Sequence, residues 1–180
     1  MRPLFPKDYR NDVTLNNMVM SVDENCRPEL LAMIGSAIAT SISDIPFDGP
    51  CATTQIGMID GEFIVNPSQA QWQDGDLQLT VASTKQKVIM IEAGANEIPE
   101  DKMIEAIYKA HDINQTIIAF IDKIVAEVGK EKHSYVSCAV PAEMFEAMKQ
   151  VVSPEEMEVA VFTDDKQTRE KNIDAVTEMG

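Results

Sequence analysis

The stretch QAQWQDGDLQLTVAST, residues 69–84, joins two acidic residues to a clean strand pattern. Asp74 and Asp76 stand just before LQLTVAS, residues 77–83, where apolar and polar side chains alternate as in a half-buried β-strand. Two carboxylates at such a position can hold a divalent metal ion, whereas Asp-Gly is a common turn sequence. These residues favour a turn at Asp74-Gly75 over a metal site.

Further strand patterns lie on both sides of this stretch. Asp60-Gly61 is a strong hairpin signal because it separates two short runs that are rich in β-branched and apolar residues. The runs of this kind are TTQIGMI (53–59), EFIVN (62–66) and, after the polar turn TKQK, KVIMIEAGA (87–95). Upstream, DVTLNNMVMSVD (12–23) also alternates and predicts a strand with a bulge at Asn16-Asn17.

Helical spacing appears before and after these strands. RPELLAMIGSAIATSI (27–42) has a proline suited to the first turn, and two prolines and a glycine in 43–50 end the helix. A second helix of about thirty residues is predicted from Glu97 to Gly129, where glycine suits the end. Its expected apolar stripe is Ile104, Ile107, His111, Ile118, Ile121, Val125 and Val128.

The C-terminal part has only helical patterns. They are PAEMFEAMKQ (141–150), VSPEEMEVAV (152–161) and TDDKQTREKNIDAVTEM (163–179). The predicted fold class is therefore α+β, with an all-α domain at residues 130–180. The α+β part divides into residues 1–50 and 51–129, and both ends of the chain are expected to have been cut from a longer protein.

Composition limits the function. The chain carries 30 acidic and 15 basic residues, a net charge of −15, so nucleic-acid binding by this chain alone is a poor hypothesis. No apolar run is long enough to span a membrane, and the N-terminus lacks a signal-peptide pattern. Three cysteines without metal-ligand spacing predict reduced, mostly buried thiols in a cytoplasmic protein.

Several longer sequence segments, in a fixed order, carry a family resemblance. They are RPLFP (2–6), PELLAMIGSAIATSISDIPFDGP (28–50), NP (66–67), LTVAST (79–84) and EIPEDKMIEAI (97–107). This series resembles bacterial polynucleotide phosphorylase, and it extends into the helical tail, which resembles the all-α linker of that family. The chain would then hold the later part of the first ribonuclease-PH-like core and much of the linker.

The resemblance implies an enzyme that degrades RNA from the 3′ end with inorganic phosphate and magnesium, releasing nucleoside diphosphates. It implies a homotrimeric ring, further RNA-degradation proteins as partners, and chemistry located in the second core. No metal ion or other cofactor is expected in this stretch. The first core of the family is usually degenerate and lines the RNA path. The acidic charge agrees with this, because the RNA-holding parts of the family lie elsewhere in its chain.

Alignment of the VAST segment to the active core of the family tests for catalysis. It places Trp72 and Gln78 at the positions of two metal-binding aspartates, and Thr80 at the position of a lysine. Neutral side chains cannot replace anionic oxygen ligands for magnesium, and phosphoryl transfer depends on such charges. No catalytic residue and no metal site are therefore expected here. Arg2, next to the RNA-facing segment of the family, is a candidate RNA contact.

Other chemistry-bearing residues have structural explanations. His111 lies on the predicted stripe and is expected to be a hydrogen-bonded core residue. Cys51 has no basic neighbour in sequence and is not expected to be a nucleophile. The methionines Met144, Met148 and Met157 are expected to pack in a core rather than line a groove.

Three functional hypotheses remain. The first is a structural part of a phosphorolytic exoribonuclease, which builds the ring and the RNA channel. The second is a stand-alone acidic protein-interaction module. A natural stop codon after Gly180 would support this hypothesis. The third, an independently active nuclease, is disfavoured by Trp72, Gln78 and Thr80.

Overall fold

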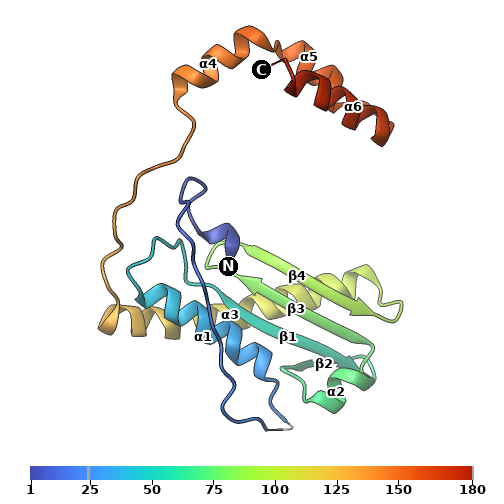
Figure 1. Ribbon diagram of the computed structural model, residues 1–180. Coiled ribbons are helices and arrows are strands. Elements are labelled where there is room, and N and C mark those ends of the chain that lie inside the picture. Colours follow the sequence, from blue (N-terminus) through green and yellow to red (C-terminus); the bar gives the residue numbers. More distant parts are fainter. Residues whose placement is uncertain (24, 180) are drawn as a thin grey trace. The chain divides into compact units, whose positions relative to one another are not determined.

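A computed structural model describes residues 1–23 and 25–179, and the chain divides into two compact units, 1–136 and 137–180. Gly180, after which the second hypothesis requires a stop, lies outside the described residues. Figure 1 shows a sheet with long helices in the first unit and helices alone in the second. The α+β fold class is therefore confirmed. No helix within the described ranges is long and apolar enough to cross a membrane.

A four-stranded antiparallel sheet organises the first unit. Its strands are β1 (Ala52–Ile59), β2 (Glu62–Val65), β3 (Leu77–Ser83) and β4 (Val88–Ala95), in the order β2-β1-β3-β4. The two-residue turn at Asp60-Gly61 joins β1 to β2, as predicted, since Ile59 pairs with Glu62. Both turn residues have positive φ, which this turn type requires. The second predicted hairpin, β3 to β4, is also present.

Helix α3 (Glu100–Val128) covers one face of this sheet (Figure 1). Leu77, Leu79 and Val81 alternate onto that face and pack against Ala106 and Ala110. The buried line of α3 is Ala106, Ala110, Asn114, Ile118 and Ile121. The predicted stripe is confirmed at Ile118 and Ile121, which are buried. It is wrong at its two ends, because Ile104 is 53% and Val128 58% exposed. Small alanines allow α3 to approach the sheet closely.

Helix α1 (Pro28–Ile42) packs against α3 and β1 (Figure 1). The second core cluster joins Ala37 of α1 to Ile121 of α3, with Leu4, Phe47 and Cys51 between them. Leu4 ends the short 3-10 helix η1 (Arg2–Leu4). This cluster fastens the N-terminal residues to the helices.

The strand predicted at residues 12–23 is wrong. The structure gives this stretch no strand, and Asp23 makes only an isolated bridge to Cys26. Met18 and Met20 are 76% and 85% exposed. A β-strand needs a neighbouring strand to receive its hydrogen bonds, and none of the four strands of the described sheet pairs with this segment. The alternation is real, but nothing in the described chain pairs with it.

The segment before β3 also differs from the prediction. Residues Gln69–Asp74 form the short helix α2, which begins with a capping box between Ser68 and Gln71. Gly75 then links α2 to β3, and a Cβ there would lie 2.9 Å from the backbone oxygens of both Gln71 and Met58. The predicted turn at Asp74-Gly75 is therefore a helix end and a close backbone approach, which only glycine permits.

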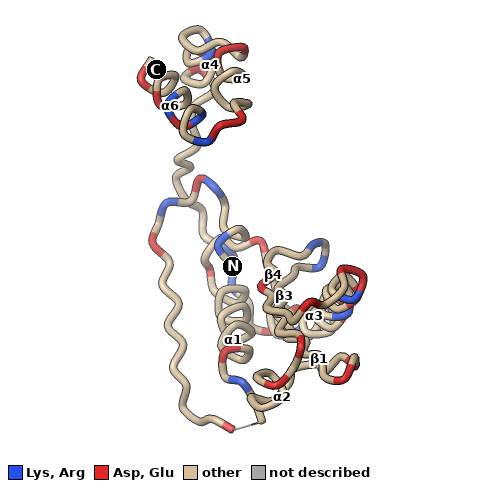
Figure 2. Tube along the Cα trace, turned by 90° about the vertical axis from the view of Figure 1, so that its right-hand side faces the viewer, with Lys and Arg blue, Asp and Glu red and all other residues tan. Residues whose placement is uncertain are grey.

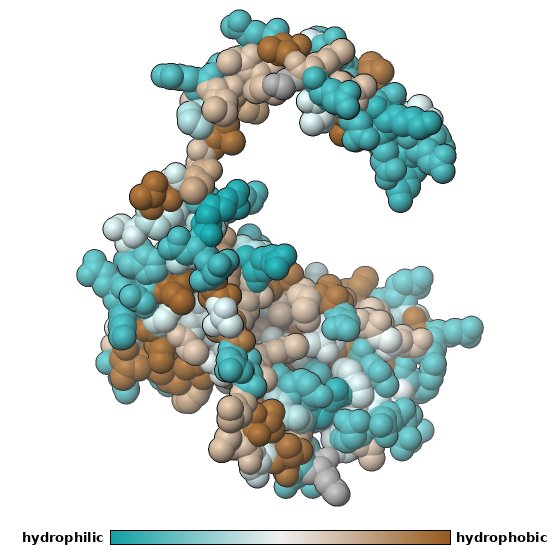
Figure 3. Space-filling view, in the orientation of Figure 1, coloured by the Kyte–Doolittle hydropathy of each residue, from teal (hydrophilic) through white to brown (hydrophobic). Residues whose placement is uncertain are grey.

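The second unit contains α4 (Ala142–Val151), α5 (Pro154–Val161) and α6 (Lys166–Thr177). Among its described residues, Ala160 is the one buried hydrophobic side chain. The expectation that Met144, Met148 and Met157 are core residues is wrong, because they are 58%, 40% and 44% exposed. They line an apolar hollow of about 580 Å³, and Figure 3 shows hydrophobic residues at the surface.

The cysteine prediction is wrong for two of three residues. Cys51 is buried, but Cys26 and Cys138 are exposed. Both exposed cysteines lie outside helices and strands, where no packed layer covers them.

Candidate functional site

The positions singled out from the sequence lie on α2 and β3. Trp72 stands on α2, and Gln78 and Thr80 stand on β3, on the face opposite Leu77, Leu79 and Val81. Gln78 Nε2 donates to the backbone oxygen of Trp72 at 2.7 Å, which ties α2 to the strand. The structure therefore brings Trp72 and Gln78 into direct contact.

Thr80 is connected to the neighbouring strand. It pairs with Gln55 of β1 in the sheet register, and Gln55 Nε2 donates to Thr80 Oγ1 at 3.4 Å. Both side chains are almost fully buried. The group formed by Trp72, Gln78, Thr80 and Gln55 is thus neutral, and each polar member can offer only an amide or a hydroxyl group.

The acidic residues before β3, Asp74 and Asp76, are not part of this group. Asp74 and Asp76 are both exposed, and the backbone of Asp76 is used to hold β1 and the residue after β4, through Met58 O at 2.8 Å and Asn96 N at 3.0 Å. Within residues 1–23 and 25–179 no three His, Cys, Asp or Glu side chains lie close enough to hold a metal ion. The residues present do not fit magnesium, which prefers anionic oxygen ligands.

Arg27 is a member of the site that the sequence analysis missed. Its guanidinium lies over the Trp72 ring, 4.2 Å from the ring centroid, within reach of a cation–π interaction. Glu29 Oε2 is 3.7 Å from Arg27 Nε. Arg27 is the N-cap residue of α1 and directly precedes Pro28, but no local sequence signal places its side chain beside Trp72.

The other candidates lie apart from this group. Arg2 is in η1, exposed, beside an apolar hollow of about 590 Å³. His111 is half-buried rather than a core residue, with Gln115 Nε2 3.3 Å from its ring. Burial raises the pKa of the Cys51 thiol, which keeps it protonated and unreactive.

Basic side chains do not form a continuous surface. Figure 2 shows Lys and Arg as short, separated segments among the acidic residues. Lys102 and Lys109 both approach the Phe63 ring, at 5.9 and 5.5 Å from its centroid, but Lys102 also pairs with Glu105. A backbone-tracking nucleic-acid groove requires a positively charged path, and these separated groups do not make one.

Comparisons with known proteins agree with this fold. Residues 49–113 match the sequence profile of the 3′ exoribonuclease family, domain 2. The polyribonucleotide nucleotidyltransferase of Lachnoclostridium phytofermentans is 72% identical over 173 residues, covering 96% of this chain and 25% of that protein. Its counterpart in Ruminiclostridium cellulolyticum is 48% identical over 178 residues, covering 99% of this chain and 25% of that protein. The chain thus spans about a quarter of the length of these relatives.

A solved structure supports the fold independently. The crystal structure of rice (Oryza sativa) Rrp46 matches with a TM-score of 0.52 and 16% sequence identity, covering 58% of this chain and 51% of that chain. At this identity the similarity concerns the fold alone.

The sequence profile defines residues 49–113 of this chain as domain 2 of the 3′ exoribonuclease family. Within that family the chain belongs with the bacterial polyribonucleotide nucleotidyltransferases and represents a stretch of them.

Proposed function

We propose that this chain is a non-catalytic part of a phosphorolytic 3′-to-5′ exoribonuclease that acts in mRNA degradation in the cytoplasm. Its work is architectural: it contributes to a homotrimeric ring, lines the RNA path and spaces the two ribonuclease-PH-like cores. The 72% identity to a polyribonucleotide nucleotidyltransferase supports the parent activity, with RNA and inorganic phosphate as substrates. Magnesium would belong to the second core of the whole protein.

The neutral side chains of Trp72, Gln78 and Thr80, at the positions of two aspartates and a lysine in the family's active core, carry the proposal. Phosphoryl transfer requires charge stabilisation of anionic oxygens by metal ions or cationic side chains. Here Gln78 is engaged with the Trp72 backbone and Thr80 with Gln55. Neither side chain carries charge, Asp74 and Asp76 are exposed, and residues 1–23 and 25–179 contain no cluster of three potential metal ligands.

The test uses the purified chain with labelled single-stranded RNA, phosphate and magnesium. Fluorescence anisotropy follows binding and gel electrophoresis follows strand length. We expect no shortening under any combination of phosphate and magnesium. Binding without shortening would support a retained role in the RNA path. Phosphate-dependent shortening by a sample free of other nucleases would overturn the proposal.

A second function is favoured by one observation. The apolar hollow of α4, α5 and α6 is exposed in the chain as described, as expected for an acidic protein-interaction module. The coding sequence that follows Gly180 discriminates: an in-frame second core supports the first function, and a stop codon supports the second.

A further inference from the structure

The apolar hollow of the second unit is built from all three of its helices. Met144, Phe145 and Met148 come from α4, Met157 comes from α5, and Val176 comes from α6. The hollow has a volume of about 580 Å³, and its lining residues all belong to this unit. This volume is in the range of pockets that enclose a bound ligand.

The wall of the hollow suits the apolar face of a helix. Three of its residues are methionines, whose unbranched side chains adapt to the shape of a partner. Phe145, which is 56% exposed, adds a flat apolar surface beside them. Exposed apolar surface of this kind is typical of a contact with another protein, and apolar grooves commonly receive an amphipathic helix.

Carboxylates flank the hollow. Residues 137–180 hold ten acidic and four basic residues, and Figure 2 shows acidic segments along these helices. Glu156 and Glu158 stand one position to either side of Met157, and a helix turns by about 100° per residue, so they lie on its two flanks. Hydrogen bonds from the Ser153 backbone N–H and hydroxyl lower the pKa of Glu156, which therefore stays charged at neutral pH.

Two of the four basic side chains of this unit are engaged with groups of the unit itself. Lys149 Nζ pairs with Glu146 Oε1 at 2.7 Å and lies 4.7 Å from the Phe145 ring centroid. Arg169 Nη1 donates to the backbone oxygen of Thr163 at 3.1 Å. The surroundings of the hollow are therefore negatively charged, and they favour a positively charged partner.

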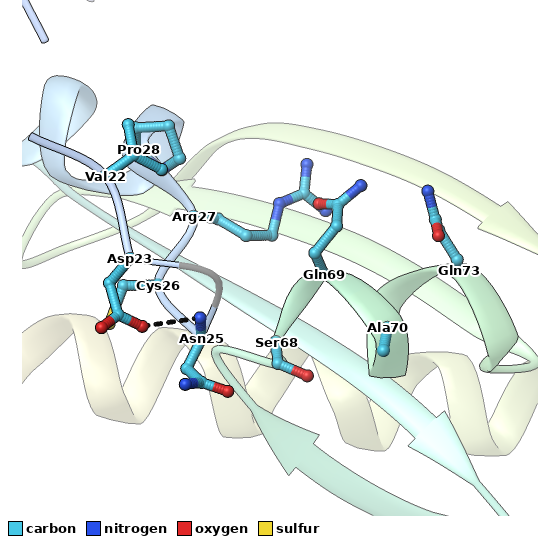
Figure 4. Close-up of a pocket in the computed structure, with 10 residues that line it drawn as sticks. All are labelled: Val22, Asp23, Asn25, Cys26, Arg27, Pro28, Ser68, Gln69, Ala70 and Gln73. Atoms are coloured by element: carbon cyan, nitrogen blue, oxygen red, sulfur yellow. Dashed lines mark hydrogen bonds between the residues drawn. The ribbon is translucent and has the colours of Figure 1, made fainter.

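The hollow between α2 and the start of α1, shown in Figure 4, has a different lining. Its volume is about 520 Å³, and Ser68, Gln69 and Gln73 in its wall are polar. An apolar helix face would separate such hydroxyl and amide groups from water without replacing their hydrogen bonds, which weakens binding. Methionine, phenylalanine and valine side chains instead make up most of the wall in the second unit. An apolar helix face therefore fits the second unit better.

We propose that the hollow of α4, α5 and α6 binds a basic amphipathic helix of a partner protein. Large apolar side chains of this helix, spaced i, i+4 and i+7, enter the hollow. Lysine or arginine side chains on its flanks face the carboxylates of Glu156 and Glu158. A second copy of this chain is a poor occupant, because each copy carries a net charge of −15. The inference rests on the second function proposed above, the protein-interaction module, and names the chemistry of its partner.

The test uses the full chain and a fluorescently labelled helical peptide with leucines on one face and lysines on the others. A second peptide carries glutamate in place of every lysine. A third has the composition of the first, in an order that gives no apolar stripe. Fluorescence anisotropy should show the first peptide binding at least about tenfold more tightly than either control, and salt should weaken its binding by screening the charges.

NMR of the methionine methyl groups locates the bound peptide. The methyl resonances of Met144, Met148 and Met157 should shift on addition of the first peptide. Those of Met18 and Met20, which are exposed in the first unit, should not shift. Shifts that follow the concentration of the chain rather than that of the peptide would identify a second copy as the occupant and overturn the proposal.

Paired variants test the wall of the hollow. Met144→Gln with Met148→Gln keeps two long side chains but removes apolar surface, and should weaken binding of the first peptide about tenfold or more. Val159→Gln with Phe162→Gln is the control, because these residues are 71% and 79% exposed and lie outside the lining. It should change the affinity by about twofold or less. Circular dichroism establishes that both variants keep their helices.

The outcomes separate the partner from the module. Equal binding of either control peptide at the same methionines would overturn the basic amphipathic helix as the partner and leave the interaction module standing. Absence of methyl shifts in the second unit with all three peptides would overturn both.

Discussion

Asn114 joins α3 to two strands of the sheet through one fully buried amide. Its Oδ1 accepts from Thr54 Oγ1 at 2.8 Å, and its Nδ2 donates to Val81 O at 3.0 Å and Ser83 Oγ at 2.9 Å. Asn114→Ala would remove all three hydrogen bonds and leave the fully buried Thr54 and Ser83 hydroxyl groups without this partner. We expect the free energy of unfolding to fall by about 2–3 kcal/mol, measured by urea denaturation.

Asp112→Ala is the matched control, because Asp112 lies on the exposed side of the same helix. It should change the free energy of unfolding by about 0.5 kcal/mol or less. An Asn114→Ala variant as stable as this control would show that the buried network contributes nothing.

The sequence did not reveal which single polar residues, such as Asn114, are buried in the core or lie at the site. The signal was an asparagine at four-residue spacing after Ala106 and Ala110, but alanines are weak markers of a buried stripe beside Ile104 and Ile107. Arg27 and Gln55 were missed for a related reason. Arg27 Nε and Nη1 and Gln55 Oε1 are buried without a hydrogen-bond partner among the described residues. This is a property of the packed structure, which no spacing rule predicts.

At the scale of elements, the helices, strands and turns that were predicted correctly are those specified by nearby residues in the sequence. The Asp60-Gly61 turn, the alternation of residues 77–83 and the long helix ending at Gly129 all have local signals, and all are present. The strand at residues 12–23 depended on a neighbour, which alternation cannot supply. Helix α2 was not predicted, although Ser68 and Gln71 form a capping box at its start. The sequence Asp74-Gly75 is typical of a turn and favoured a different structure for this segment.

Lys132 fastens the segment after α3 to the end of α1. Its Nζ donates to the backbone oxygens of Thr40, Ser41 and Ser43 at 3.1, 3.0 and 2.6 Å. These are carbonyls at a helix C-terminus, where a cation is favourable. Next to it, the His133 N–H donates to Asp44 O at 2.7 Å. The first unit therefore extends beyond α3 through contacts of single residues.

Lys132→Met should remove these three hydrogen bonds and loosen the segment. We expect the amide of His133 to lose protection in hydrogen-exchange mass spectrometry or NMR, while amides of β3 keep theirs. Lys130→Met is the control, because Lys130 is exposed and contributes through its backbone N–H to Ile42 O. Equal exchange rates at His133 in both variants would contradict the role of the Lys132 side chain.

Helix α6 depends on pH through its N-cap. Asp165 accepts from the Thr168 N–H at 2.8 Å and from Thr168 Oγ1 at 2.7 Å, and these hydrogen bonds lower the pKa of the Asp165 carboxyl below its ordinary 3.8. Because the folded pKa is the lower one, the cap stabilises α6 fully above the unfolded pKa. This stabilisation is lost as pH falls through the folded pKa.

The Thr168 amide resonance should therefore shift on acidification with a midpoint below 3.8. Asp165→Asn keeps an acceptor oxygen at the cap without a titrating group, so the same resonance should not titrate with this midpoint. A midpoint at or above the ordinary carboxyl value in the unmodified chain would show that the cap does not form in solution.

At the scale of the whole molecule, net charge and exposed apolar surface have opposite effects on self-association. The net charge of −15 disfavours association of like chains, and salt screens this repulsion. Apolar side chains are nevertheless exposed in both units, including Met20 at 85% and Phe162 at 79%. Surfaces of this kind ordinarily mark contacts with other protein. Composition alone could not reveal them, because it counts apolar residues without saying which are buried.

We therefore expect the chain to self-associate, and more strongly as salt is raised, because screening weakens charge repulsion while apolar burial persists. Residues 12–22 should contribute, since their exposed apolar side chains alternate along a chain without a paired strand. Met18→Lys with Met20→Lys should reduce the mass measured by light scattering. Asn16→Lys with Ser21→Lys adds the same charge to the same segment without removing apolar surface, and should reduce it less. A monodisperse monomer at all salt concentrations would contradict this expectation.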